Sequence, residues 1–175
     1  MFPIVQGGID FDLRKRCLEG LVPKDANGYA IGGLAGGEAK SDFFKIVRYN
    51  CELLPKNKPR YLMGVGYPVD IALCAGLGVD MFDCVFPTRT ARFGTAFTSF
   101  GEIKLRNKIY ATDFRPLDEN CDCEACTNFT RAYLHMIEKE DNFCHLLSMH
   151  NISFNFRVMK NVRKAIFENK LPEFY

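Results

Sequence analysis

Short apolar runs alternate with amphipathic segments through the first half of the chain. The runs that predict strands lie at residues 2–5, 29–31, 61–63 and 79–86. Their residues are apolar throughout instead of alternating with polar ones, which is typical of strands covered on both faces. Between the runs, apolar residues recur at helical spacing and predict three helices. These residues are Leu13, Cys17, Leu18 and Leu21, then Phe44, Val47, Cys51 and Leu54, then Val69, Leu73 and Leu77.

This alternation predicts an α/β fold in which βα units build a parallel sheet. Each predicted strand ends in glycine or proline, at Gly7-Gly8, Gly32-Gly33, Gly64 and Pro87. In a (β/α)8 TIM barrel such strand ends form the active-site face, and a complete barrel takes about 250 residues. The pattern therefore predicts either a partial TIM barrel with about half of the strands, or an open sheet with a small ligand site.

A different pattern begins after Arg92. Residues 95–97 and 103–105 flank Ser99-Phe100-Gly101 and predict a β-hairpin. A turn-rich, acidic stretch follows at 116–124, and helices are predicted at about 127–139 and 142–169. We therefore expect four segments. They are βα units of the barrel at 1–94, a hairpin insertion at 95–112, a metal-binding helical subdomain at 113–155 and a C-terminal helix at 156–175.

Composition and charge narrow the class only modestly. The 175 residues are 47% hydrophobic and 25% charged with a net charge of +2, as in an ordinary globular protein. Basic residues gather in two stretches, 86–110 and 156–170, which predict either a polyanion footprint or two solvated faces. No apolar run approaches the roughly 20 residues of a membrane span, and the N-terminus shows no signal-peptide pattern.

Three of the eight cysteines, Cys121, Cys123 and Cys126, fall within six residues. That spacing differs from a disulfide framework and indicates a reducing compartment with one metal cluster. Three thiolates and one histidine form a recognised structural zinc set, and His150 on the predicted helix is the fourth ligand we expect. His135 and His145 remain alternatives for that position, and three unliganded core cysteines remain an alternative to the metal.

Asp83 is the main candidate for chemistry because it is an acid at the end of an apolar run. A carboxylate at a strand end can attack an anomeric carbon and hold the sugar as an ester. The alternative is a buried salt bridge with Arg89 or Arg92. For Asp80 we expect an anchoring role toward backbone amides or an arginine. Gln6 can donate to and accept from a base edge, and Met63 can pack on a ring, although both residues also have ordinary structural interpretations.

Several motifs, in this order, resemble the tRNA-guanine transglycosylase family over residues 2–175. They are Ile4-Val5-Gln6-Gly7-Gly8, Ala30-Ile31-Gly32-Gly33-Leu34-Ala35, Tyr61-Leu62-Met63-Gly64-Val65-Gly66, residues 80–89, the three clustered cysteines and His150-Asn151. The resemblance implies the C-terminal half of an irregular (β/α)8 barrel with a zinc subdomain.

The resemblance also implies a role for individual residues. Asp83 would be the nucleophile that takes the ribose C1′ as guanine leaves. Gln6 and the Gly33-Leu34 backbone would bind the incoming base, and Met63 and Gly64 would line its site. Arg89 and Arg92 would hold flipped anticodon bases of the tRNA. The zinc ligands would be Cys121, Cys123, Cys126 and His150.

A pentosyltransferase of this family exchanges the wobble guanine of tRNA for a modified base without ATP or a redox cofactor. Gly36 stands where bacterial members typically carry valine, and the loss of that side chain leaves room for a bulkier base. The resemblance therefore favours the eukaryotic catalytic subunit, which uses queuine. It further implies a heterodimer with a homologous non-catalytic subunit, or a homodimer. It places the protein in the cytoplasm, with peripheral association with the mitochondrial outer membrane as a further option.

The resemblance leaves the N-terminal half of the barrel unmatched, including acids that grip the base. We therefore expect this chain to lack turnover by itself, because half a barrel exposes strand edges and apolar surface. Two other functions remain open: a non-catalytic partner subunit, and a zinc-containing RNA-binding module.

Overall fold

The structure is a computed structural model that describes residues 1–171. The chain forms two compact units. The first comprises Met1–Cys84 and the residues from Asn161 onward, and the second comprises Val85–Lys160. The hairpin and the cysteine cluster belong to the second unit, and the last long helix contributes residues to both units.

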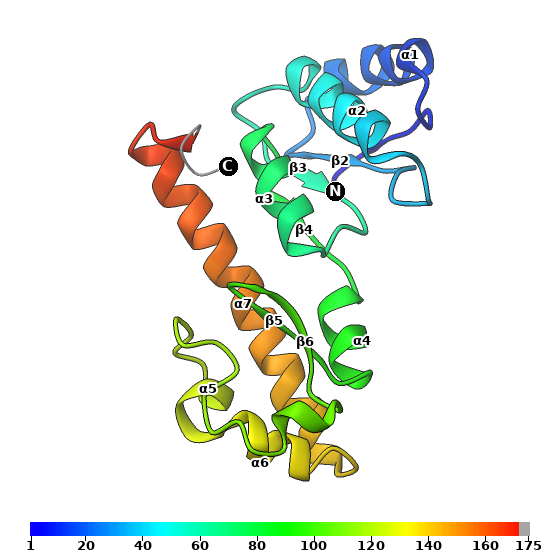
Figure 1. The fold of residues 1–175 in the computed structure, drawn as a ribbon. Helices are drawn as coiled ribbons and strands as arrows, with labels where there is room; N and C mark the ends of the chain where they lie inside the picture. The colour runs from blue at the N-terminus through cyan, green and yellow to red at the C-terminus, as the bar shows by residue number, and fades with distance from the viewer. Residues whose placement is uncertain (172–175) are drawn as a thin grey trace. The chain divides into compact units, whose positions relative to one another are not determined.

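A parallel four-stranded sheet organises the first unit (Figure 1). Its strands pair in the order β1 (Ile4–Val5), β2 (Tyr29–Ile31), β3 (Arg60–Leu62) and β4 (Met81–Phe82). The parallel sheet and the helices that alternate with its strands confirm the predicted α/β class. The described strands form an open sheet with β1 and β4 at its edges.

The predicted strand at 79–86 is much longer than the strand that forms. Pairing stops after Phe82, and a helix, α4, begins at Phe86 with proline in its first turn. Proline fits the first turn of a helix because the amide it lacks has no intrahelical partner there. Val79 is buried without being part of the strand, so its apolar character reflects packing and not strand pairing.

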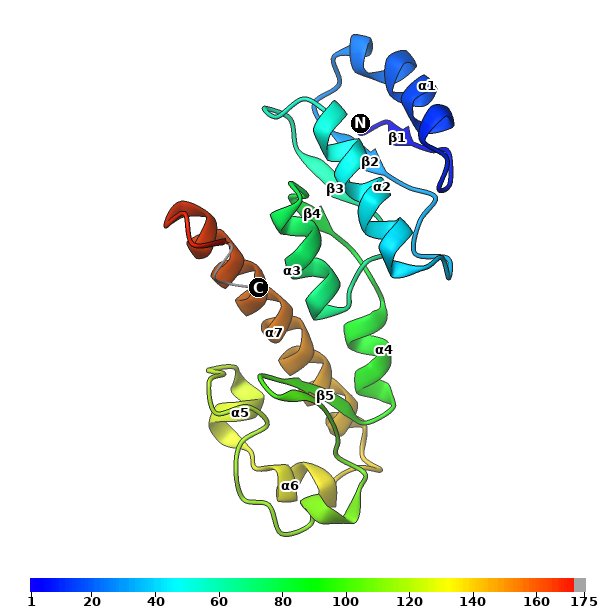
Figure 2. The ribbon, with the colours of Figure 1, turned by 45° about the horizontal axis from the view of Figure 1, so that its top comes forward.

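Three helices, α1 (Phe11–Leu21), α2 (Lys40–Leu53) and α3 (Pro68–Gly76), connect the strands and lie around the sheet (Figure 2). A short 3₁₀ turn, Val22–Lys24, follows α1. The Asp10 side chain caps α1 by accepting a hydrogen bond from the Leu13 backbone N–H. The buried face of α1 differs from the prediction: Leu13 is exposed, whereas Arg14 is buried beside Leu18.

The second unit begins with α4 (Phe86–Arg92) and the predicted hairpin, whose strands are β5 (Thr95–Thr98) and β6 (Gly101–Lys104). A 3₁₀ turn at Lys108–Tyr110 leads into the turn-rich stretch. The remaining elements are α5 (Glu124–Asn128), α6 (Arg131–Met136) and α7 (Asp141–Phe167). Helix α7 matches the predicted helix at 142–169 within two residues at each end, while the predicted residues 172–175 lie outside the described part.

The single helix predicted at 127–139 is wrong. Phe129 and Thr130 adopt extended backbone angles and separate α5 from α6. The Thr130 hydroxyl accepts a hydrogen bond from the Tyr133 N–H at 3.1 Å, which caps α6. Periodicity continued through the break because Phe129 also packs against the core of this unit.

The core of the second unit lies between the hairpin, the turn-rich stretch and α7. Its buried apolar residues include Ala96, Leu105, Leu117, Leu134, Phe143 and Leu147. Two ion pairs fasten the segment between the hairpin and α5 to helices: Arg157 of α7 pairs with the buried Asp118, and Arg131 of α6 pairs with Asp113 at 3.0 Å. No helix in residues 1–171 is long and apolar enough to cross a membrane.

Candidate active site and metal centre

Asp83 lies directly after β4, where the sheet ends. Its Oδ1 accepts two hydrogen bonds, from the Tyr61 hydroxyl at 2.5 Å and from the Gly64 N–H at 3.0 Å. Both of these bonds fall on Oδ1. The carboxylate is exposed and its donors are neutral, which differs from the buried salt bridge considered as the alternative.

These donors hold the carboxylate in its charged form. The pKa of Asp83 lies below its ordinary value, chiefly because of the Tyr61 hydrogen bond and then because of the Gly64 N–H. The same bond raises the pKa of Tyr61, which therefore stays protonated and remains a donor. Asp83 is thus ionised at neutral pH, as a nucleophilic carboxylate must be.

Asp80 has a structural task, as predicted. Its Oδ2 accepts the Arg60 N–H at 2.9 Å, and its own N–H donates to the Arg60 carbonyl at 2.9 Å. The pair extends the β3–β4 contact by one residue toward the strand starts and away from Asp83.

Gln6 packs its amide against the backbone at the end of β2. A β-carbon at Gly32 would lie 3.1 Å from Gln6 Nε2, and one at Gly33 would lie 2.6 Å from Gln6 Oε1. Gly33 also has a φ of +67°, a conformation that side chains disfavour. Only glycine lets the Gln6 amide approach this closely.

Met63 directly follows β3, the strand next to β2. Its sulfur would lie 3.4 Å from a β-carbon at Gly32, and the next residue, Gly64, donates to Asp83. The structure therefore brings Gln6, Gly33, Met63, Gly64 and Asp83 together, and we call these five residues the strand-end cluster. Leu34 follows Gly33 directly and is half-buried.

The sequence interpretation missed three residues that support this cluster: Tyr61, Glu38 and Arg14. Glu38 accepts the N–H groups of Ala35 at 2.6 Å and Gly36 at 2.9 Å, and so fixes the loop after Gly33. Burial raises the pKa of Glu38, but backbone N–H donors outweigh it and hold that pKa below its ordinary value. A tyrosine in an apolar strand looks like a core residue in the sequence. Only the register that places Tyr61 beside Asp83 could have revealed its role as a donor.

The second unit gathers the predicted metal ligands. His150 Nδ1 lies 3.7 Å from Cys121 Sγ, 3.5 Å from Cys123 Sγ and 3.3 Å from Cys126 Sγ. All four ligand atoms lie within 4.8 Å of one another. This donor set and its compactness fit tetrahedral zinc with no open position, which is the pattern of a structural site.

The His150 ring is oriented by a hydrogen bond on its far side. Nε2 lies 2.7 Å from the Phe97 carbonyl oxygen, which only accepts, so Nε2 carries the proton and Nδ1 offers its lone pair to the thiols. His135 instead bonds the Leu105 carbonyl through Nδ1 at 2.6 Å, and His145 is exposed. The geometry therefore favours His150 over both alternatives.

Asn151 extends the same contact to α4. Its Oδ1 accepts the Phe97 N–H at 2.9 Å, and its Nδ2 donates to the carbonyls of Pro87 and Thr95, each at 3.0 Å. Residues 150 and 151 therefore hold both polar backbone groups of Phe97. They also tie the cysteine cluster to the helix that carries Arg89 and Arg92, which are exposed in its last turn.

The protein is thus an α/β protein with an ionised carboxylate at the ends of its parallel strands. Its second unit adds a compact cluster of three cysteines and one histidine that could hold a metal ion. Comparison with known proteins gives the family. Residues 1–175 match the model of the family described as Queuine tRNA-ribosyltransferase. The chain therefore belongs to the queuine tRNA-ribosyltransferase family.

Individual relatives agree with this assignment. The chain is 52% identical over 176 residues to the "Queuine tRNA-ribosyltransferase catalytic subunit" of Caenorhabditis briggsae, with 99% of this chain and 44% of the relative covered. It is 50% identical over the same length to the protein of that name from Caenorhabditis elegans, again with 99% and 44% covered. It is 47% identical to the "Queuine tRNA-ribosyltransferase" of Dictyoglomus turgidum, with 99% and 45% covered. The chain thus spans a little under half the length of these relatives.

The metal centre gives the first prediction. Replacing His150 with Ala removes the oriented nitrogen, so the zinc content of purified protein should fall from about one ion per chain to a small fraction. The matched control is His145→Ala on the same helix, which should retain zinc. Metal content measured by mass spectrometry decides, and equal zinc in the two variants would contradict the assignment.

The second prediction concerns Tyr61→Phe, which removes the largest influence on Asp83. The pKa of Asp83 should rise toward its ordinary value, measured from the pH dependence of its carboxyl ¹³C shift. Since the folded-state pKa is depressed, the stabilisation from this bond is present above the ordinary carboxyl pKa and disappears as pH falls through the folded value. Tyr133→Phe serves as control, and an unchanged Asp83 titration in Tyr61→Phe would refute the coupling.

Proposed function

We propose that this chain carries the nucleophile and much of the base-binding site of a tRNA-guanine transglycosylase, which exchanges the wobble guanine of tRNA for queuine. The observation that carries the proposal is an ionised carboxylate, Asp83, fixed through one oxygen after β4, where the strand ends of the same sheet also carry the Gln6–Gly33 contact. Family membership supports the reaction class.

The chemistry has two displacements. First, Asp83 Oδ2 bonds to C1′ of the ribose as the C1′–N bond to guanine breaks, and the departing base takes the electron pair and then a proton. Next, a nitrogen of the incoming base bonds to C1′, the ester bond breaks, the base loses a proton, and Asp83 returns as a carboxylate. A carboxylate suits both steps because the transition states have oxocarbenium character.

The other members of the strand-end cluster would hold the base. The Gln6 amide can both donate to and accept from the polar edge of a purine-like ring. The Gly33-Leu34 backbone would bind the same edge, and the Met63 thioether can pack on the ring face beside Gly64. Gly36 has no side chain to limit the size of the ring substituent, which favours queuine over smaller bases.

The same proposal extends to the fold. Four parallel strands with helices between them would form the C-terminal half of a (β/α)8 barrel, whose active sites lie at the carboxyl ends of the strands. Asp83 and the rest of the cluster follow strand ends, as that architecture requires.

The second unit would serve the tRNA. Zinc bound by Cys121, Cys123, Cys126 and His150 would be structural, because four protein ligands leave no position for substrate. Arg89 and Arg92 on α4 would contact the anticodon region. We further propose a cytoplasmic enzyme that works as a dimer, either with a homologous subunit or with itself.

Labelled-guanine exchange into tRNA tests the function. The test enzyme is the Caenorhabditis briggsae relative with its matching segment replaced by this chain, hereafter the chimera. Asp83→Asn in the chimera should lower kcat by a factor of about 10³ or more, because the amide is a poor nucleophile. The matched control is Asp25→Asn, which changes an exposed carboxylate distant from Asp83 in the sequence and should leave exchange intact.

Exchange that survives in Asp83→Asn would exclude Asp83 as nucleophile. No exchange in the unsubstituted chimera, with tRNA binding preserved, would favour the non-catalytic subunit.

A further inference from the structure

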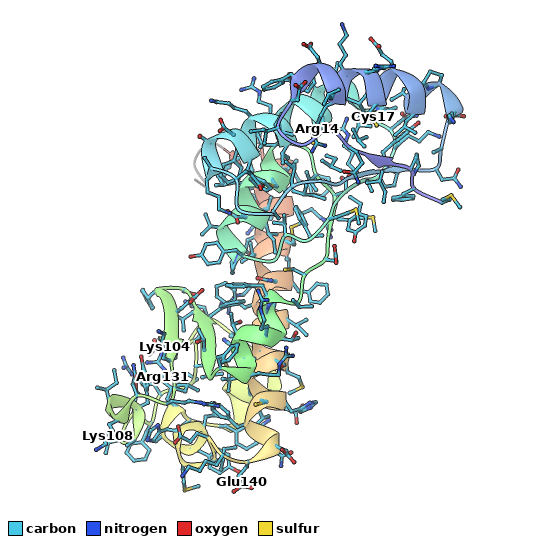
Figure 3. All side chains as sticks on the ribbon, turned by 90° about the vertical axis from the view of Figure 1, so that its right-hand side faces the viewer. Arg14, Cys17, Lys104, Lys108, Arg131 and Glu140 are labelled. Carbon is cyan, nitrogen blue, oxygen red and sulfur yellow. The ribbon has the colours of Figure 1, made fainter. Side chains whose placement is uncertain are left out.

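Arg14 is the most completely enclosed charged side chain of the described residues, with 0% of its surface exposed. It extends from α1 toward the sheet (Figure 3). Its guanidinium donates to three backbone carbonyls: Nε to Gly8 at 2.7 Å, Nη1 to Val5 at 3.3 Å and Nη2 to Gly32 at 2.8 Å. These carbonyls belong to the ends of β1 and β2, where the strand-end cluster lies.

Burying a guanidinium costs free energy unless hydrogen bonds satisfy its donors. Burial lowers the pKa of Arg14, and none of the described ion pairs involves this residue. A buried cation must be compensated by hydrogen bonds, and here the compensation comes from carbonyl oxygens. The planar guanidinium can hold three acceptors in fixed directions, which a flexible ammonium cannot do. Its donors therefore dictate the orientation of the peptides that they reach.

The peptides in question carry the base-binding groups. A trans peptide is planar, so its carbonyl and its N–H point in opposite directions. When Arg14 holds the Gly32 carbonyl, the N–H of the same peptide, that of Gly33, points away from the guanidinium. The direction of this N–H decides whether it can meet the edge of a base.

The Val5–Gln6 peptide is held at both of its polar atoms. Arg14 takes the Val5 carbonyl, and the Gln6 N–H donates to Cys17 Sγ at 3.4 Å. Arg14 and Cys17 lie one turn apart on α1, so one rigid helix fixes the backbone from which the Gln6 side chain extends.

Glycine at position 7 makes room for this arrangement. A β-carbon there would lie 2.9 Å from Arg14 Cγ and from the Arg14 backbone nitrogen, and Gly7 has a φ of +138°. Gly7 therefore makes room for the arginine as well as for the turn after β1.

From these contacts we infer that Arg14 is a positioning residue for base recognition: it orients Gln6 and the Gly33 N–H toward the incoming purine-like base. The inference rests on the proposed function. Arg14 does not touch the reacting atoms, so it should govern affinity for the base and not the chemical step.

Arg60 offers a matched control. Its guanidinium is also buried and donates to backbone carbonyls, Leu54 at 2.8 Å and Gly78 at 3.2 Å, which precede β3 and β4, whereas the strand-end cluster follows the strands. Arg14→Lys and Arg60→Lys should each lower thermal stability. If Arg14 were only structural, Arg14→Lys would lower thermal stability without changing the KM for guanine, as is expected of Arg60→Lys.

The experiment measures kcat, the KM for guanine and the KM for tRNA in the chimera, together with the melting temperature. Arg14→Lys should raise the KM for guanine about 10-fold, with kcat changed less than about 3-fold, because uniform binding is lost. Arg60→Lys should leave the KM for guanine unchanged. Equal KM values for guanine in the two variants would overturn the inference.

Should Arg14→Lys fail to fold, Cys17→Ala tests the same restraint more gently. It removes the acceptor of the Gln6 N–H and should raise the KM for guanine about 3-fold, and an unchanged KM would overturn the inference. Failure of the proposed function is separate, because it appears as exchange that survives Asp83→Asn. The Arg14 inference alone fails if Asp83→Asn abolishes exchange but the KM for guanine is the same in Arg14→Lys and Arg60→Lys.

Discussion

Parallel pairing of short strands is the constraint on which the candidate active site depends. It places the carboxyl ends of β1, β2, β3 and β4 on the same side of the sheet. The residues that follow these ends, from Gln6 after β1 to Asp83 after β4, therefore lie along that side. The strands are only two or three residues long, so pairing alone fixes little beyond their direction. Polar contacts to side chains supply the remaining precision. Arg14 holds the carbonyls after β1 and β2, while Tyr61 and the Gly64 N–H hold Asp83.

The second unit applies the same principle to the metal centre. A backbone carbonyl, that of Phe97, orients the His150 ring, and the adjacent Asn151 takes the N–H of the same residue. The ligand geometry and the hairpin are therefore specified together. Because Asn151 also bonds Pro87 and Thr95, the backbone next to Arg89 and Arg92 is held by the helix that supplies the histidine. Zinc would thus stabilise both the cluster and the surface proposed for RNA.

Much of this could be predicted from the sequence. The alternating runs gave the parallel α/β class, and cysteine spacing gave the cluster that the structure brings together with His150. Glycine pairs marked the strand ends, and Asp83 stood out as an acid in an apolar run. The misses have physical causes. Arg14 occupies a core-facing helix position because backbone carbonyls satisfy it, which hydrophobic periodicity cannot reveal. The break at Phe129-Thr130 depends on a side-chain cap within a segment whose apolar spacing continues. Tyr61 differs from a core tyrosine only through its register beside Asp83.

The central claim is that one oxygen of Asp83 is left to bond a sugar carbon, and the most direct measurement is a search for that bond. The chimera is incubated with tRNA, quenched with denaturant and digested, and the peptides are sequenced by mass spectrometry. The account predicts a ribonucleotide lacking its base on the peptide that contains Asp83, and none in Asp83→Asn. An adduct on another residue, or active exchange with no adduct on Asp83 under rapid quenching, would contradict it.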